Sequence, residues 1–165
     1  MRLPREFIER TSTLLGKDEY EKLETALEQD SPTSIRLNAR KAANHSELMG
    51  SKFLSDQIPW SSIGYYLSDR LTFTFDPLFH AGCYYVQEAS SMFIEQVVRK
   101  YVDKPVIALD LCAAPGGKST HLRSLLPDGS LLVANEVIRN RSQILLENLV
   151  KWGHPDIMVT NNDPS

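Results

Sequence analysis

A segment built mostly of small residues is the part of the chain best suited to bind a ligand. Residues 110–120 read Asp-Leu-Cys-Ala-Ala-Pro-Gly-Gly-Lys-Ser-Thr and directly follow a continuous apolar run at residues 106–109. A loop that leaves a buried strand and opens a helix points backbone N–H groups into the crevice where open α/β sheets bind ligands. Alanine and glycine let a ligand approach that backbone closely. Residues 112–118 are therefore predicted to form a binding loop.

Two phosphate-binding patterns are excluded for this loop. A Walker loop ends in the same Gly-Lys-Ser, but it needs a glycine five positions before Gly117, where Cys112 stands. The dinucleotide pattern G-x-G-x-x-G is absent because Gly116 and Gly117 are adjacent. The sequence therefore favours neither an ATPase nor a nicotinamide-dependent enzyme.

Two acidic residues follow later apolar runs. Glu136 comes 20 residues after Gly116, and a carboxylate there can accept two hydrogen bonds from the vicinal hydroxyls of a ribose. Asp163, just beyond residues 157–160, can accept a hydrogen bond from an adenine amino group. Taken alone, Glu136 would equally well be a surface acid before a helix. Together with the loop and Asp163 it predicts a nucleoside held without a phosphate cradle, which indicates S-adenosylmethionine.

The elements that must position these residues alternate between strand and helix. Apolar runs at residues 106–109, 131–134 and 157–160 predict three buried strands. One helix is expected directly after the binding loop, and a second over residues 139–152, ended by Gly153. A preceding helix is expected to run to about Tyr101, with Phe93, Val97 and Val98 facing inward. Such alternation predicts a parallel sheet with right-handed crossovers.

The amino-terminal part predicts a different architecture. Helices are expected over residues 4–15, 18–28 and 46–49, and strands over residues 34–38 and around 64–67. We therefore expect an α/β chain in which residues 1–75 form a small α+β accessory domain. Residues 76–165 would then form the first half of a Rossmann-like parallel sheet of the methyltransferase type.

Composition narrows the setting. The net charge of −3 provides no overall basic field for nucleic acid, so phosphate contacts would need a local basic patch. Cys83 and Cys112 have the spacing of neither a zinc site nor a disulfide framework, so we expect no metal and a reduced, cytoplasmic setting. No apolar run is long enough to span a membrane, and no signal peptide is recognisable. A monomer is expected.

At this point the motifs resemble a known family, the Sun (Fmu-like) RNA 5-methylcytosine methyltransferases. Residues 110–120 are similar to the first cofactor motif of that family, and residues 34–38 are similar to its Arg-x-Asn strand. Residues 82–91 resemble the segment that precedes the cofactor motif, and residues 134–136 with Arg141 and Asn148 resemble the second-strand motif. Details at residues 59–60 and 134–136 favour the bacterial branch that modifies small-subunit ribosomal RNA.

The resemblance implies a role for several residues. The loop around the methionine end of S-adenosylmethionine would comprise Cys112, Ala113, Ala114, Pro115, Gly116, Gly117 and Lys118. Glu136 would hold the ribose and Asp163 the adenine. RNA would be the partner, with Arg36, Arg40, Lys41 and Arg141 as candidate contacts. The alternative for such basic residues is a solvated surface patch.

The resemblance also implies a covalent mechanism whose nucleophile is not found in this sequence. Family members are expected to add a cysteine thiolate to cytosine carbon six, which makes carbon five nucleophilic. That cysteine belongs to a Pro-Cys motif after the fourth strand, whereas this sequence ends at Ser165, after the third. We therefore expect Cys112 only to line the cofactor loop, and residues 1–165 alone to be inactive. The alternatives are a non-catalytic RNA-binding or assembly module and a methyltransferase for protein or small molecules.

Overall fold

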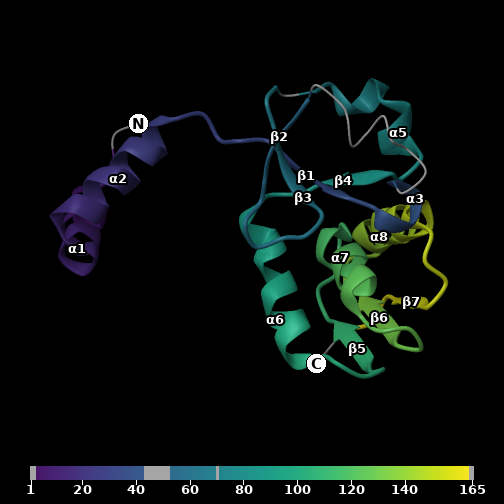
Figure 1. The fold of residues 1–165 in the computed structure, drawn as a ribbon. Coiled ribbons are helices and arrows are strands. Elements are labelled where there is room, and N and C mark those ends of the chain that lie inside the picture. Colours follow the sequence, from purple (N-terminus) through teal and green to yellow (C-terminus); the bar gives the residue numbers. More distant parts are fainter. Residues whose placement is uncertain (1–2, 43–52, 70, 164–165) are drawn as a thin grey trace. The chain divides into compact units, whose positions relative to one another are not determined.

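The computed structural model describes residues 3–42, 53–69 and 71–163, coloured along the chain in Figure 1. The helix predicted over residues 46–49 lies outside these described ranges. The chain divides into two compact units, residues 1–32 and residues 33–165. The boundary that the sequence predicts between residues 75 and 76 stays a prediction.

The first unit is a pair of helices. α1 spans Arg5–Leu15 and α2 spans Lys17–Glu28, close to the predicted ranges. The single residue between them, Gly16, has a φ of 78°, a left-handed conformation in which glycine has no steric penalty. Within these two helices Tyr20 is the residue that is buried. The core between the helices is therefore small.

The second unit begins with an antiparallel sheet. Its strands are β1 (Ser34–Leu37), β2 (Leu54–Gln57), β3 (Gly64–Leu67) and β4 (Tyr84–Val86), in the spatial order β2-β3-β1-β4. Between them lie the short helices α3 (Ala39–Ala42), η1 (Phe73–Phe75) and α5 (Pro77–His80). Ile35 and Leu37 of the central strand pack with Leu67 and Tyr84 into one core cluster. β1 is buried along its whole length because its other face packs on the rest of the unit.

The second sheet is parallel, as the alternating pattern predicts. β5 (Ile107–Asp110), β6 (Leu131–Asn135) and β7 (Ile157–Thr160) lie side by side in that order. α7 (Gly117–Leu125) connects the first two strands and α8 (Arg139–Trp152) the last two. The predicted helix end at Gly153 is confirmed, with a φ of 81°. The predicted α/β fold with a Rossmann-like parallel sheet is confirmed over the described residues.

Helices cover one face of this sheet. Ala108 and Leu132 pack against Val98 and Leu126, and Ala134 packs against Leu145. Residues 107, 109, 131, 133 and 158 point to the opposite face, where Ile107 is 80% exposed and Leu109 is 60% exposed. The prediction that residues 106–109 form a fully buried strand is therefore wrong for alternate residues of β5, because the helices of the described chain cover only one side.

The helix before β5 is rotated from its predicted orientation. A 3-10 turn, η2 (Ser90–Phe93), precedes α6 (Ile94–Tyr101) and shifts the phase of its faces. Val98 is buried as predicted, but Phe93 and Val97 are about half exposed and Glu95 is buried in their place. A buried carboxylate on this face could not be expected from apolar periodicity.

No helix within the described ranges is long and apolar enough to cross a membrane. The described part of the chain also contains no cluster of three or more His, Cys, Asp or Glu side chains that could hold a metal ion.

Candidate functional site

The predicted binding residues follow the carboxyl ends of three adjacent strands. In the sheet register Asp110 of β5 pairs with Ala134 of β6, and Asn135 pairs with Thr160 of β7. Residues 111–117, Glu136 and residues 161–163 therefore all leave the sheet at one edge. In open parallel sheets this is the edge where ligands bind.

Asn135, to which the sequence alone assigns no separate role, joins the three strand ends. Its Nδ2 donates to the carbonyl of Leu111 at 3.3 Å and to that of Asn162 at 3.0 Å. Its Oδ1 accepts from the Thr160 hydroxyl at 2.8 Å and from the Asn162 amide at 3.0 Å. An amide supplies donors and acceptors together, so one buried side chain fixes the start of all three loops.

The glycine loop is a tight turn that opens α7. Gly116 has a φ of 110°, a conformation that favours glycine, and a Cβ there would come 3.3 Å from the Leu145 side chain, which would have to shift slightly. Ala113 and Ala114 are buried, whereas Cys112 and Lys118 are both exposed. The loop therefore has small residues at its base and two accessible side chains at its margins.

Side chains from outside the loop hold its carbonyl groups. Arg141 donates to the carbonyl of Ala114 at 2.8 Å, and Asn148 donates to that of Pro115 at 2.8 Å. The Tyr85 hydroxyl also approaches Pro115, at 3.4 Å. In the sequence Arg141 and Asn148 stand out only as parts of a motif, and their spacing of seven residues places both on one face of α8.

Glu136 is buried beside the loop. Its Oε1 accepts a hydrogen bond from the Ile138 amide at 3.0 Å, and its Oε2 lies 3.5 Å from Nη1 of Arg141. Because Arg141 also binds the loop, one guanidinium connects Glu136 with Ala114. Asp163 is exposed just beyond β7. The loop, Glu136 and Asp163 are thus arranged along one edge, as the sequence predicts.

Arg36, a predicted RNA contact, is fully buried at 0% exposure. Its guanidinium donates to Gln87, Thr120 and the carbonyl of Gly117, and it stacks over the Trp152 ring with 4.4 Å between the guanidinium carbon and the ring centroid. In this structure the guanidinium offers no surface to an RNA phosphate. It joins the antiparallel sheet to α7 and α8 instead.

The remaining predicted RNA contacts differ in exposure. Lys41 is partly buried, and its Nζ donates to the carbonyls of Ala81 and Lys151 at 2.8 and 2.6 Å. A lysine is well placed there because a cation stabilises the carboxyl end of a helix, here α8. Arg40 is exposed, and the side chain of Arg141 is half exposed.

A second buried polar cluster lies between α6, α7 and the turn before β3. Glu95 accepts hydrogen bonds from Ser61, Ser62 and Arg99, and lies 3.2 Å from Nε2 of His121. Burial alone would raise the pKa of the Glu95 carboxyl, but these hydrogen bonds lower it to about 2. Burial, together with the charge of Arg36, lowers the pKa of His121 to about 4. Both carboxylate oxygens of Glu95 have partners, whereas Nδ1 of His121 is buried without one among the described residues. The cluster connects α6 and α7 with the turn before β3.

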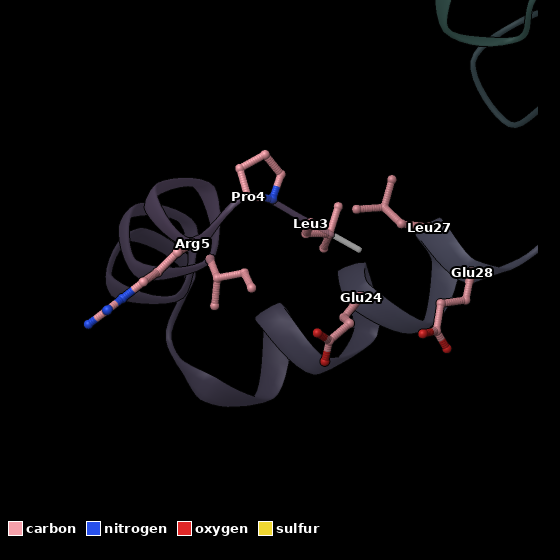
Figure 2. Close-up of a pocket in the computed structure, with 7 residues that line it drawn as sticks. Leu3, Pro4, Arg5, Glu24, Leu27 and Glu28 are labelled. Atoms are coloured by element: carbon pink, nitrogen blue, oxygen red, sulfur yellow. The ribbon is translucent and has the colours of Figure 1, made fainter. Parts of the chain in front are cut away.

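A hollow of about 670 Å³ lies in the helix pair of the first unit, as Figure 2 shows. Arg5 and Ile8 of α1 and Glu24, Leu27 and Glu28 of α2 line it, with Leu3 and Pro4. It contains no residue that the sequence predicts to bind a ligand and no nucleophile, so we assign it no chemistry.

Comparison with known proteins gives the family. Residues 3–89, more than half of the chain, match the family described as the N-terminal domain of 16S rRNA methyltransferase RsmF. The chain belongs to this family. Residues 99–165 match the family described as 16S rRNA methyltransferase RsmB/F, whose methyl donor is S-adenosylmethionine. The predicted resemblance to ribosomal RNA methyltransferases of the Sun type is confirmed.

Individual relatives agree with this assignment to the RsmF family. Ribosomal RNA small subunit methyltransferase F of Aliivibrio salmonicida is 34% identical over 112 residues, covering 66% of this chain and 24% of the relative. The same enzyme of Pectobacterium atrosepticum is 29% identical over 171 residues, covering 98% and 35%. The fold is also that of a methyltransferase homologue from Pyrococcus horikoshii, whose crystal structure has a TM-score of 0.74 at 24% identity, covering 97% of this chain and 57% of that one. The chain thus spans about a quarter to a third of the curated relatives quoted.

Proposed function

We propose that the complete protein containing this chain transfers a methyl group from S-adenosylmethionine to carbon five of a cytosine in small-subunit ribosomal RNA. Family membership supports the methyl donor and the class of RNA. One observation carries the proposal. Residues 112–118, the buried carboxylate of Glu136 and the exposed carboxylate of Asp163 follow the ends of adjacent strands at one edge of the parallel sheet.

Residues 112–118 would hold the methionine part of S-adenosylmethionine. The side chains at the base of the loop are small, and α7 starts at Gly117, so backbone N–H groups of its first turn can bind a carboxylate. Several loop carbonyls are already bound by Arg141, Asn148 and Thr120. Bound carbonyls keep the loop in one conformation, so a ligand would lose little affinity to ordering it.

Glu136 and Asp163 would hold the nucleoside part. Oε1 of Glu136 is bound by the Ile138 amide, which leaves Oε2 as the oxygen for a ribose hydroxyl. Arg141 lies 3.5 Å from Oε2 and helps to hold the carboxylate in position. Asp163 leaves the next strand along the same edge, where the adenine amino group would extend.

The methyl donor supplies an electrophilic methyl group, and the nucleophile must come from the RNA base. We propose that a cysteine outside residues 1–165 adds its thiolate to cytosine carbon six, which makes carbon five able to attack. Carbon five would then take the methyl group, with S-adenosylhomocysteine as the leaving group. A base removes the proton of carbon five, and the bond between carbon six and the cysteine sulfur breaks to release the thiolate. Cys112 is at the margin of the loop and would only line the site, so residues 1–165 would transfer no methyl group by themselves.

The proposal is tested with purified complete protein, S-adenosylmethionine carrying a labelled methyl group, and small-subunit ribosomal RNA both free and in assembled subunits. After digestion to nucleosides, mass spectrometry should find the label in 5-methylcytidine. Residues 1–165 assayed beside it should give none. Label on another nucleoside contradicts the proposed position. RNA binding without any label would favour the non-catalytic assembly module.

A further inference from the structure

Arg36 crosses from the antiparallel sheet to the start of the glycine loop's helix. It lies on β1, and its Nη2 donates to the Thr120 hydroxyl at 2.5 Å and approaches the carbonyl of Gly117 at 3.3 Å. Its Nε donates to Oε1 of Gln87 at 2.8 Å. The antiparallel sheet therefore makes contact, through one guanidinium, with the first turn of α7.

Burying the Arg36 guanidinium costs free energy of folding, and a residue with only a packing role would not need a charge there. Burial lowers the pKa of the Arg36 guanidinium to about 9, although Tyr85 and the charge of Glu95 act in the opposite direction. None of its hydrogen bonds to the described residues goes to a carboxylate. Its Nη1 is buried and has no hydrogen-bond partner among the described residues. Buried charges that lack a hydrogen-bonded opposite charge disfavour folding, and apolar replacements of similar volume are often neutral or stabilising.

The groups that Arg36 holds belong to the proposed cofactor loop. Thr120 donates to the carbonyl of Gly116 at 2.8 Å, so it connects Arg36 with the residue that opens the helix. A trans peptide points its C=O and N–H in opposite directions. Holding the carbonyl of Gly117 toward Arg36 and Thr120 therefore helps to fix the direction of the Lys118 N–H.

The same sheet supports the loop at a second point. Tyr85, on β4, lies so close that a Cβ on Gly117 would come 3.3 Å from its ring, and its hydroxyl approaches the carbonyl of Pro115 at 3.4 Å. The ring also flanks the Arg36 guanidinium at 5.9 Å. The loop thus rests on two adjacent strands of the other sheet, although it belongs to the parallel one.

We infer that Arg36 is a positioning residue of the cofactor loop: acting through Thr120 and Gly117, it sets the orientation of the loop amides without touching the cofactor. The inference rests on the proposed function, since it needs residues 112–118 to bind S-adenosylmethionine. It makes the antiparallel sheet a determinant of cofactor affinity. Changes in β1 would then alter methyl-donor binding through a side chain that is out of contact with the donor.

The test compares two buried arginines in the complete protein. Arg36→Met is the test variant and Arg123→Met the control, because Arg123 is also buried, at 1% exposure, and lies on the helix that Arg36 contacts. Arg123 donates to carbonyls that follow the carboxyl end of that helix, those of residues 126, 127 and 130. Calorimetry then gives the dissociation constant of S-adenosylmethionine at a temperature where circular dichroism shows every variant folded.

Arg36→Met should weaken binding about tenfold, the loss expected for one charge-assisted hydrogen bond in the chain that orients the loop. Its loop amides should also exchange hydrogen faster than in the parent protein. Arg123→Met should leave the dissociation constant unchanged even where it lowers the melting temperature. A role in stability alone would move the melting temperature in both variants and the affinity in neither.

If Arg36→Met fails to fold, Arg36→Lys serves as a second test variant. A lysine retains the charge, but one ammonium lacks the rigid fork that reaches Gln87 and Thr120 together, so its affinity should also fall. Unchanged affinity in a folded Arg36 variant overturns the inference. Absence of binding by the unaltered protein would instead refute the proposed function, and the inference with it.

Discussion

Arg141 connects two parts of the proposed cofactor site, with its Nη1 3.5 Å from Oε2 of Glu136 and its Nη2 2.8 Å from the carbonyl oxygen of Ala114. Replacing it by alanine should release both the carboxylate and the loop. We expect Arg141→Ala to weaken S-adenosylmethionine binding by about 1 kcal/mol, a value kept low because the side chain is half exposed.

Calorimetry on the complete protein measures this effect. Arg139→Ala is the matched control, since Arg139 is an exposed arginine two positions earlier on the same helix. Equal affinities for Arg141→Ala and the parent protein would show that the bridge does not shape the site.

Cys112→Ala tests whether the loop cysteine does chemistry. Cys112 is exposed at the margin of the glycine loop, and we expect the variant of the complete protein to retain most of its turnover. A covalent adduct with RNA should still form, detected as a band that survives denaturing electrophoresis. If the adduct disappears while cofactor affinity is intact, Cys112 is the nucleophile and our assignment is wrong.

Acid should destabilise the fold through His121. Above its ordinary pKa of 6.5 the imidazole is neutral in both states, so its contribution is constant there. Because burial lowers the folded pKa to about 4, the unfolded chain alone binds a proton between these two values. The contribution of His121 to the free energy of unfolding is therefore complete above pH 6.5. It decreases by about 3 kcal/mol as the pH falls toward 4.

Urea denaturation at a series of pH values measures that loss. His121→Gln should have a flatter dependence between pH 6.5 and 4, whereas His80→Gln, at a more accessible ring, should keep the parent slope. His154, whose pKa burial also lowers, is present in all three proteins and cancels. A parent slope retained in His121→Gln would exclude the imidazole as the cause. Below pH 4.5 Glu95, with its lowered pKa, adds a further loss in the same direction.

Gly82→Ala should damage the junction between β4 and α8. A Cβ at Gly82 would come 2.2 Å from the carbonyl oxygen of Lys151, and the φ of 71° disfavours alanine. We expect a loss of about 2 kcal/mol or more in the free energy of unfolding.

The control for this variant is Gly129→Ala. Gly129 has a φ of 84°, but a Cβ there meets nothing closer than 3.7 Å, so only the backbone penalty of about 1 kcal/mol applies. Similar losses in the two variants, measured by urea denaturation, would mean that the close approach at Lys151 has no energetic weight.

The parallel sheet and its loop were predictable because their signals are local. An apolar run followed by small residues marks a strand that ends in a binding turn, and Gly153 marks the end of α8 through its own backbone conformation. Glu136 could be placed because strand ends of a parallel sheet lie at one edge. These inferences need no knowledge of how distant segments pack.

The role of Arg36 was not predictable for the opposite reason. Its partners Thr120 and Trp152 lie 84 and 116 residues away in the sequence, and nothing in residues 34–38 shows that the strand is buried on both faces. An arginine near Arg40 and Lys41 favours a surface patch in any sequence-based interpretation. Glu95 is similar, since its burial depends on the hydroxyl groups of Ser61 and Ser62, in a turn more than 30 residues away.

Titration of S-adenosylmethionine into the complete protein and its Glu136→Ala variant tests the central claim most directly. Glu147→Ala, which removes an exposed acid from α8, is the matched control. We predict that Glu136→Ala weakens binding by about 1–3 kcal/mol, the scale for losing charge-assisted hydrogen bonds to a ribose, while Glu147→Ala binds like the parent. Equal affinity of the Glu136→Ala variant and the parent protein would contradict the placement of the cofactor at this edge of the sheet.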